Sequence, residues 1–388
     1  MPSVLSRRLT GARAFSRPAI GSANLDWRTL GFGPRPTAAV VKYEYERGAW
    51  DAGTESAQPT VELHLFSHVL NFGQSIFEGL KAFHTADGRV CLFNPACNAA
   101  RLRSGAARLM LPSVPDALFF EGLERTVRAN AAYLPPYGSG GALYIRPVLF
   151  GHGPLMAIAP APRFTLAFIS TPVGAFFDGA LRGKRALVRD DFDRAAPRGT
   201  GGFKVAGNYA PDMLVSQGTH ERGFDVSLFL DAKTQTMIEV CAARRRPRVE
   251  PRALATARGS TRARARAAAA QEFSVANFVA VAADGSIVSP SSPSVLPSCT
   301  RSVVLRLARE LGLRAHEREI AWAEVSSLKE VAACGTAVVL TPMSSITRGE
   351  QVVEFASHPT VQRLYDAVVQ TQTGERPDSL GLLHEVTL

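Results

Sequence analysis

The sequence predicts an α/β (α+β) protein built from two domains. The chain has 388 residues, more than a single hydrophobic core usually serves. Apolar runs of strand length alternate along it with amphipathic segments of helical period. The stretch Thr171-Pro172-Val173-Gly174 interrupts this pattern and indicates a linker. We therefore expect a smaller N-terminal α/β domain over residues 26–172, a linker over 173–180 and a larger C-terminal domain over 181–388.

The expected N-terminal domain combines strands with two helices. Asp87-Gly88 is a hairpin signal between two apolar segments, and Asn94-Pro95 is typical of a helix start. Residues 115–133 carry apolar side chains at helical spacing. The expected strands are residues 38–45, 80–85, 89–93, 143–150 and 164–170, and the expected helices are 94–110 and 115–133.

The expected C-terminal domain has the same mixed character. Asp284-Gly285 is a second hairpin signal, and Gly312 is a typical residue after the end of a helix. The expected helices are residues 208–218, 300–311 and 358–370. The expected strands are 226–230, 236–239, 273–282 and 286–288, and residues 331–340 form a further apolar run.

Residues 240–271 are a low-complexity insert of arginine and alanine. They contain no aromatic residue and no apolar period, so they cannot bury enough surface to fold alone. They interrupt what otherwise looks like one strand, from Met237-Ile238-Glu239 into residues 272–278. Valine codons begin with GT and a glutamine codon can end with AG, so the limits Val240 and Gln271 suggest a retained intron. A solvated loop and an anion-binding arm are the alternatives.

The charge of the chain is concentrated in two segments. The net charge is +10, of which residues 1–25 contribute +4 and the insert +8, leaving −2 for the rest. This distribution does not support nucleic-acid binding by the folded body. No apolar run reaches 18 residues, so no membrane span is expected. The five cysteines have no Cys-x-x-Cys or Cys/His metal spacing, which favours reduced thiols inside a cell and no metal site.

The first 25 residues have the composition of an organelle transit peptide. They are rich in arginine, serine and alanine and contain no acidic residue. The stretch Arg13-Ala14-Phe15-Ser16 resembles a mitochondrial processing site with cleavage after Phe15. We expect a mitochondrial protein, with the plastid or the cytoplasm as alternative locations. The simplest alternative is that these residues form a tail without targeting function.

Lys204 is the residue that most directly indicates chemistry. It lies among apolar and glycine residues in Phe203-Lys204-Val205-Ala206-Gly207-Asn208-Tyr209. Lysine is rarely buried without a partner, so such a lysine either extends to solvent or is used chemically. Desolvation favours the neutral amine, which condensation with an aldehyde requires. An aldehyde cofactor such as pyridoxal phosphate would also need an acid at its ring nitrogen, a donor at its ring hydroxyl and an anion site.

Five short stretches together resemble one enzyme family. They are Phe77-Glu78-Gly79-Leu80-Lys81-Ala82-Phe83, Tyr144-Ile145-Arg146-Pro147, Lys204-Val205-Ala206-Gly207-Asn208-Tyr209, Leu296-Pro297-Ser298-Cys299-Thr300-Arg301 and Gly335-Thr336-Ala337. In order and spacing they resemble the branched-chain amino acid aminotransferases, which are fold-type IV pyridoxal 5'-phosphate enzymes. The resemblance covers about residues 28–385 apart from the insert. It implies a homodimer that exchanges the amino group of leucine, isoleucine or valine with 2-oxoglutarate and glutamate.

The resemblance also implies roles at the cofactor. Lys204 matches the lysine that binds the cofactor aldehyde and moves the substrate proton, and Tyr209 matches the tyrosine at the ring hydroxyl. Glu272 matches the acid at the pyridine nitrogen, with Glu239 as the rival that the insert separates from it. Val275 replaces a threonine of the mammalian-type pattern, so a hydroxyl contact there is in doubt. The phosphate ligands implied are Arg101, Cys299, Thr300 and Thr336.

The substrate pocket implied by the resemblance has an apolar wall and two anion sites. Arg146 lies two residues from Tyr144 on the same strand face and is expected to bind the second carboxylate of glutamate. Thr336 and Ala337 are expected to offer backbone N–H groups to the α-carboxylate. The aromatic wall implied is Phe32, Phe72, Phe77 and Tyr144, each of which could instead be an ordinary core residue.

Three other interpretations remain open at this point. One is another fold-type IV enzyme, either a D-amino acid aminotransferase or an aminodeoxychorismate lyase, although residues 77–83 and the Tyr144–Arg146 pair disfavour it. Another is a non-catalytic protein that binds RNA through the insert. The third is a family member that the insert at Glu272 has inactivated.

Overall fold

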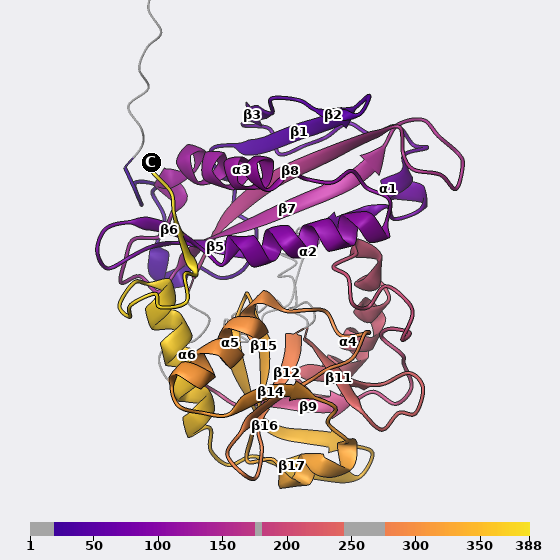
Figure 1. Cartoon of the computed structure of the whole chain (residues 1–388), viewed down its shortest axis with the longest axis vertical. Helices are drawn as coiled ribbons and strands as arrows, with labels where there is room; N and C mark the ends of the chain where they lie inside the picture. Colours follow the sequence, from indigo (N-terminus) through magenta and orange to yellow (C-terminus); the bar gives the residue numbers. More distant parts are fainter. Residues whose placement is uncertain (1–18, 175–180, 244–275) are drawn as a thin grey trace, which may run out of the picture.

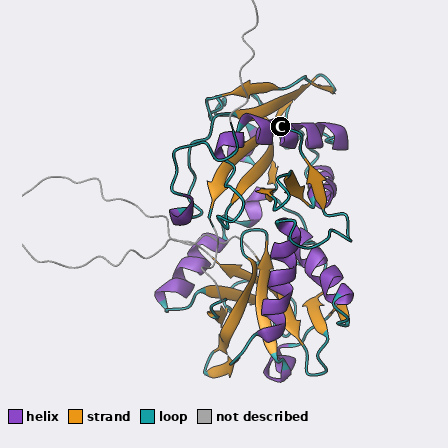
Figure 2. Cartoon of the chain, turned by 90° about the vertical axis from the view of Figure 1, so that its left-hand side faces the viewer, coloured by secondary structure: helices purple, strands orange, loops and turns teal. Residues whose placement is uncertain are grey.

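The computed structural model describes residues 19–174, 181–243 and 276–388 (Figure 1). Two β-sheets lie one above the other along the long axis, with helices packed on each (Figures 1 and 2). This arrangement confirms the predicted mixed α/β class. In the part of the chain that is described, no helix is long and apolar enough to cross a bilayer. The expected processing site, residues 175–180 of the expected linker, residues 244–271 of the insert, Glu272 and Val275 lie outside the described residues.

The first sheet has nine strands and is antiparallel throughout. Its order is β18-β6-β5-β7-β8-β1-β2, with β3 beside β1 and β4 beside β7. The last strand of the chain, β18, therefore returns to the N-terminal sheet. The bounds are β1 Val40–Glu46, β2 Ala49–Trp50, β3 Thr54–Ser56, β4 Ser75–Phe77, β5 Leu80–His84, β6 Val90–Phe93, β7 Ala142–His152, β8 Arg163–Val173 and β18 Leu383–Glu385.

Helices α2 (Pro95–Arg108) and α3 (Asp116–Ala129) pack against the first sheet, and the short α1 (His68–Asn71) contacts β7. Apolar side chains at helical spacing on α3, among them Phe119, Leu123 and Val127, are fully buried. They meet sheet residues such as Phe168 in the first core. Gly122 is required there, because a Cβ atom would lie 2.3 Å from the Phe168 ring.

The second sheet also has nine strands, of which six form a closed ring. The path β11-β10-β9-β16-β15-β12 returns to its start because β12 also pairs with β11. β13 and β14 extend the path, and β17 pairs with β16. The bounds are β9 Lys184–Val188, β10 Val226–Leu230, β11 Ile238–Ala243, β12 Ala276–Val281, β13 Ile287–Pro290, β14 Ala315–Arg318, β15 Glu330–Gly335, β16 Val339–Arg348 and β17 Gln351–Glu354.

Helices α4 (Asp212–Glu221), α5 (Cys299–Glu310) and α6 (Pro359–Gln372) pack on the second sheet. One hydrophobic core joins the two halves of the molecule. It contains Phe83 and Phe93 of the first sheet together with Val303 of α5 and Leu364 of α6. This shared core holds the start of α5 close to the edge of the first sheet, where several of the predicted site residues lie.

Three elements differ from the sequence prediction. Thr171-Pro172-Val173, expected to mark the linker, are the last residues of β8. The helix expected over residues 208–218 begins only at Asp212, because residues 206–208 form a 3-10 turn and Pro211 precedes the helix. The strand expected over residues 236–239 is β11, which runs from Ile238 to Ala243 and so includes the first four residues of the insert, and it pairs antiparallel with β12.

Candidate active site

The segment around Lys204 is held by backbone pairing to the first sheet. The Phe77 N–H donates to the Lys204 carbonyl over 3.2 Å, and Ile76 forms an antiparallel bridge with Val205. The 3-10 turn of residues 206–208 then brings Tyr209 back beside Lys204. The Lys204 ammonium nitrogen donates to the Tyr209 hydroxyl over 3.1 Å. A half-buried amine therefore sits beside a phenol at the junction of the two sheets.

Aromatic rings cover this amine. The Lys204 Nζ atom lies 4.5 Å from the centre of the Phe77 ring, and the Phe77 and Tyr209 rings are 4.9 Å apart. On β7, Arg146 donates to the Tyr144 hydroxyl over 2.8 and 3.1 Å and stacks 4.7 Å from Phe77. The Phe32 ring contacts Tyr144 at 6.0 Å. Three of the four predicted wall aromatics, and the predicted arginine, thus form one connected cluster with Lys204.

Phe72 is the fourth predicted wall residue, and the structure does not bring it to the cluster. Its side chain is 51% exposed, and its ring contacts His68 at 5.2 Å. The residue ends the short helix α1, where the chain turns outward before β4. Sequence spacing could not reveal this turn, because His68–Asn71 is too short to have a clear apolar period.

The residues predicted to bind phosphate lie close together. Cys299 and Thr300 form the first turn of α5, whose N-cap Ser298 accepts a hydrogen bond from the Arg301 N–H over 3.1 Å. They line a small cavity with Thr336, which lies in the turn between β15 and β16. Unpaired backbone N–H groups and the helix dipole make this helix start suitable for an anion.

Arg101 lies beside this cavity, but its charge is already matched. Its Nε atom donates to Glu78 Oε1 and its Nη2 atom donates to Glu78 Oε2, both over 2.7 Å. Its Nη1 atom donates over 3.0 Å to the Pro297 carbonyl. Although burial opposes the charged form, Glu78 raises the pKa of Arg101. The arginine therefore stays charged and ties α2 to the segment that precedes α5. Glu78 belongs to the first of the five motifs, but its pairing with Arg101 was not predicted from the sequence.

The acid expected at the pyridine nitrogen cannot be placed, because Glu272 lies outside the described residues. The rival Glu239, on β11, is 3% exposed and accepts a hydrogen bond from the Ser292 hydroxyl over 2.8 Å. Burial raises its pKa, against the hydrogen bond from Ser292 and the charge of Arg194. The assignment of Glu272 remains a prediction.

A set of buried polar atoms near Tyr209 shows that the residues present fit a polar aromatic cofactor. Within the described residues, Arg194 Nε, both carboxylate oxygens of Asp212 and the Ser294 hydroxyl are buried without a hydrogen-bond partner. The Arg194 charge interacts with Asp212, Tyr209 and Glu239, so these groups are neighbours. Burial raises the pKa of Asp212 to about 6, an effect that Arg194 opposes. Buried polar groups are normally paired, so this region suits a ligand with donors and acceptors of its own.

Sequence reasoning missed Arg194, Asp212 and Ser294, which belong to none of the five motifs. It also missed Lys81, which is 8% exposed and donates to the Ala337 carbonyl over 3.0 Å. A lysine inside an apolar strand was the available signal, and it is the same signal that identified Lys204.

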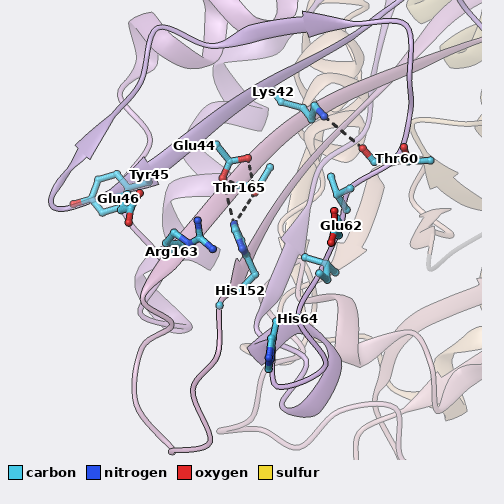
Figure 3. Close-up of a pocket in the computed structure, with 13 residues that line it drawn as sticks. Lys42, Glu44, Tyr45, Glu46, Thr60, Glu62, His64, His152, Arg163 and Thr165 are labelled. Carbon is cyan, nitrogen blue, oxygen red and sulfur yellow. Dashed lines mark hydrogen bonds and ion pairs between the residues drawn. The ribbon is translucent and has the colours of Figure 1, made fainter.

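A different cavity, of about 350 Å³, lies over the outer strands of the first sheet (Figure 3). Three of its polar groups, Glu44, His152 and Thr165, bind one another. The Thr165 hydroxyl lies 2.8 and 2.9 Å from the Glu44 carboxylate oxygens, and His152 Nε2 lies 3.3 Å from Glu44 (Figure 3). None of the predicted site residues lines this cavity, so the chemistry is better assigned to the Lys204 cluster.

Comparison with known proteins supplies a family. A sequence model described as amino-transferase class IV matches residues 265–346. The branched-chain-amino-acid aminotransferase of Helicobacter pylori is 35% identical over 366 residues, which cover 94% of this chain and 98% of that protein. The one from Haemophilus influenzae is 37% identical and covers 91% and 96%. The branched-chain amino acid aminotransferase 1, mitochondrial, of Humulus lupulus is 33% identical and covers 94% and 85%.

Solved structures agree on the fold. A crystal structure of the branched-chain amino acid aminotransferase of Escherichia coli has a TM-score of 0.68 at 24% identity, over 90% of this chain and all of that one. The enzyme from Thermobaculum terrenum, solved in its pyridoxal phosphate form, has a TM-score of 0.68 at 20% identity, over 91% of this chain and all of that one. At these identities the likeness is one of fold, and it confirms the predicted fold-type IV architecture.

Proposed function

Because the chain belongs to the branched-chain-amino-acid aminotransferases of the class IV aminotransferase family, we propose that Lys204 and its neighbours catalyse the family's reaction here. That reaction is the reversible, pyridoxal-phosphate-dependent exchange of an amino group between leucine, isoleucine or valine and 2-oxoglutarate, which yields branched 2-oxo acids and glutamate. The observation that supports it best is the Lys204–Tyr209 hydrogen bond of 3.1 Å inside a wall of aromatic rings.

When bound, pyridoxal phosphate supplies the aldehyde that accepts the amino group and the ring that withdraws electrons from the substrate. Lys204 would hold that aldehyde and afterwards move the proton at the substrate Cα. Tyr209 keeps the Lys204 amine in place through its hydroxyl. Phe77 lies over the same amine and limits the access of water to it. One positioned amine that serves both steps reduces the cost of orientation.

The phosphate would lie at the start of α5, with Cys299, Thr300 and Thr336 as ligands and Arg101 beside them. Cys299 would contribute its backbone, because its thiol is buried and its side chain is a poor anion ligand. Glu272 would keep the ring nitrogen protonated. Arg194 and Asp212, which are neighbours of Tyr209, would gain polar partners from a cofactor that carries donors and acceptors of its own.

Both substrates would use the pocket bounded by Phe32, Phe77 and Tyr144. A branched apolar side chain packs against these rings. The second carboxylate of glutamate would pair with Arg146, whose guanidinium is half-buried and already oriented by the Tyr144 hydroxyl. Thr336 and Ala337 would present backbone N–H groups to the α-carboxylate that all the substrates share.

We further propose a homodimer in which Phe72 lies at the interface. Residues 61–72 and 156–158 carry large apolar side chains that are exposed in the single chain, and the two segments touch where His68 Nε2 lies 3.2 Å from the Ala157 carbonyl. A contiguous apolar patch on a soluble protein indicates a protein partner. The exposed members are Val61, Leu65, Phe66, Leu70, Phe72, Met156 and Ile158.

We also propose that residues 1–25 form a mitochondrial transit peptide. We propose that the remainder of the chain divides into two domains, residues 26–172 and 181–388. The two separate sheets support this division, although β18 returns to the first sheet.

A fusion of residues 1–25 to a fluorescent protein is expected to enter mitochondria. Entry into plastids, or a diffuse cytosolic signal, would contradict the proposed destination.

The substrate assignment is tested by assaying the purified protein with and without residues 240–271. With 2-oxoglutarate as acceptor, we expect kcat/KM for L-leucine to exceed that for D-alanine by at least about 100-fold. Lys204→Ala should lose the visible absorbance band and reduce kcat by about 10²–10⁴-fold, since the proton-moving amine is gone.

Faster turnover of D-alanine or aminodeoxychorismate would assign another fold-type IV activity. If the shortened protein is active while the full chain is not, the insert has inactivated this family member. If neither form turns over leucine although both bind the cofactor, the proposed substrate is wrong.

The dimer is tested by the double variant Leu65→Asp/Ile158→Asp. Two carboxylates in an apolar interface should be costly, so we expect the mass measured by light scattering at micromolar concentration to halve. Val352→Asp is the matched control, because Val352 is 55% exposed on β17 at the far end of the second sheet (Figure 1). A wild-type chain that is already monomeric, or a control variant that dissociates equally, would refute the proposed interface.

A further inference from the structure

Lys81 is a second lysine in the candidate site, and the mechanism above does not use it. It lies on β5 and pairs across the ladder with Tyr144 of the substrate wall. Its side chain is 8% exposed. The Nζ atom donates to the Ala337 carbonyl over 3.0 Å and lies 5.3 Å from the centre of the Phe32 ring. The ammonium group is thus fixed between the aromatic wall and the turn that joins β15 to β16.

No described carboxylate forms an ion pair with Lys81. The carboxylate of Glu78, three residues away, already accepts hydrogen bonds from Arg101, Asn98 and the Gly79 N–H. The strand pairing and the cavity lining place two titratable groups beside Lys81, Tyr144 of β7 and Cys299 of α5, and Arg146 lies two residues from Tyr144 on the same strand. Burial alone lowers the pKa of Lys81 from 10.5 to about 8. At neutral pH the amine is still mostly charged and lacks a counter-ion.

The position of this unmatched charge indicates which anion it serves. Its hydrogen-bond acceptor, Ala337, belongs to the turn whose N–H groups are expected to meet the α-carboxylate. An ammonium group has three donors, and the Ala337 carbonyl uses one of them. Arg146 is oriented by the Tyr144 hydroxyl and is reserved for the second carboxylate of glutamate.

We propose that the Lys81 ammonium binds the α-carboxylate of every amino acid and 2-oxo acid substrate, beside the backbone of Thr336 and Ala337. This proposal rests on the proposed function and extends it to one named side chain. An alternative anion with the same chemistry is the cofactor phosphate, because Lys81 also borders the cavity lined by Cys299 and Thr300. The substrate carboxylate is favoured because the Lys81 Nζ atom contacts the Ala337 turn and the Phe32 ring.

The first test compares Lys81→Met, Lys81→Gln and Lys81→Arg. Loss of a charge-assisted hydrogen bond should raise KM for both leucine and 2-oxoglutarate by about 10-fold or more in the Met variant, with kcat changed little. The Gln variant retains a donor for the Ala337 carbonyl but not the charge, so it should behave like Met. The Arg variant should recover much of the affinity.

A substrate without the carboxylate gives the matched control. 3-Methylbutylamine is leucine without its carboxylate, so the ratio of kcat/KM for leucine to kcat/KM for this amine should fall by about 10-fold in the Met variant. The dissociation constant of pyridoxal phosphate, measured by fluorescence, should be unchanged. If this constant rises while KM for leucine does not, Lys81 serves the phosphate and the proposal is overturned.

The second test uses binding without turnover. 4-Methylpentanoate has the carboxylate and the branched chain of leucine but no amine, and calorimetry measures its affinity directly. Because the charged form of Lys81 binds, affinity in the wild type should fall as pH rises through about 8. Binding should also take up protons near that pH, and both effects should vanish in Lys81→Met.

Several results would overturn the proposal. One is a Gln variant with wild-type KM values, which would reduce Lys81 to a support for the turn. Another is a calorimetric pH profile that is the same in the wild type and the Met variant. If the wild type binds 4-methylpentanoate through Lys81 but does not turn over leucine, the proposed function fails while the carboxylate site stands.

Discussion

The backbone pairing of Ile76 and Phe77 with Val205 and Lys204 is the contact on which the candidate site depends. Lys204 precedes the second sheet's helix α4, whereas Phe77 ends β4 of the first sheet, so this short bridge fixes the amine between two separate sheets. Main-chain hydrogen bonds allow little lateral freedom, and the 3-10 turn that follows determines where Tyr209 must lie. A lysine on a free loop would lose conformational entropy each time it reacted. In this structure the fold already holds the lysine segment in place, so this entropy is lost on folding and not in each reaction.

At the same junction, several lysine and arginine side chains have no carboxylate partner among the described residues and can therefore bind anions. Lys81 lines the small cavity at the start of α5, Arg146 and Lys204 lie against the Phe77 ring, and no described carboxylate forms an ion pair with any of the three. Arg101 is the exception, because Glu78 neutralises it and both side chains are almost fully buried. Arg101 of this pair also connects α2 to the segment before α5, because it donates a hydrogen bond to the Pro297 carbonyl. Because Lys81, Arg146 and Lys204 have no carboxylate partner in the described part of the chain, their charges are available to substrates that carry one or two carboxylates.

The sequence predicted the parts of the site whose spacing is local. Lys204 and Tyr209 are five residues apart in one turn, Tyr144 and Arg146 share a strand face, and Cys299 begins a helix that has a clear N-cap. It could not predict contacts that depend on how the sheets meet. The burial of Arg194 Nε and of the Asp212 carboxylate without partners, and the Glu78–Arg101 pair, arise from tertiary packing. Phe72 lies apart from the aromatic cluster because it follows the one-turn helix α1, which local spacing does not reveal.

The central claim is that one amine, Lys204, holds the cofactor. The most direct measurement is reduction of the cofactor-loaded protein with sodium borohydride, followed by peptide mass spectrometry. The account predicts a single phosphopyridoxyl group on Lys204 and unmodified Lys81, because only Lys204 has its amine placed against the Tyr209 hydroxyl. A stable label on Lys81 or on surface lysines, with Lys204 unmodified, would contradict it.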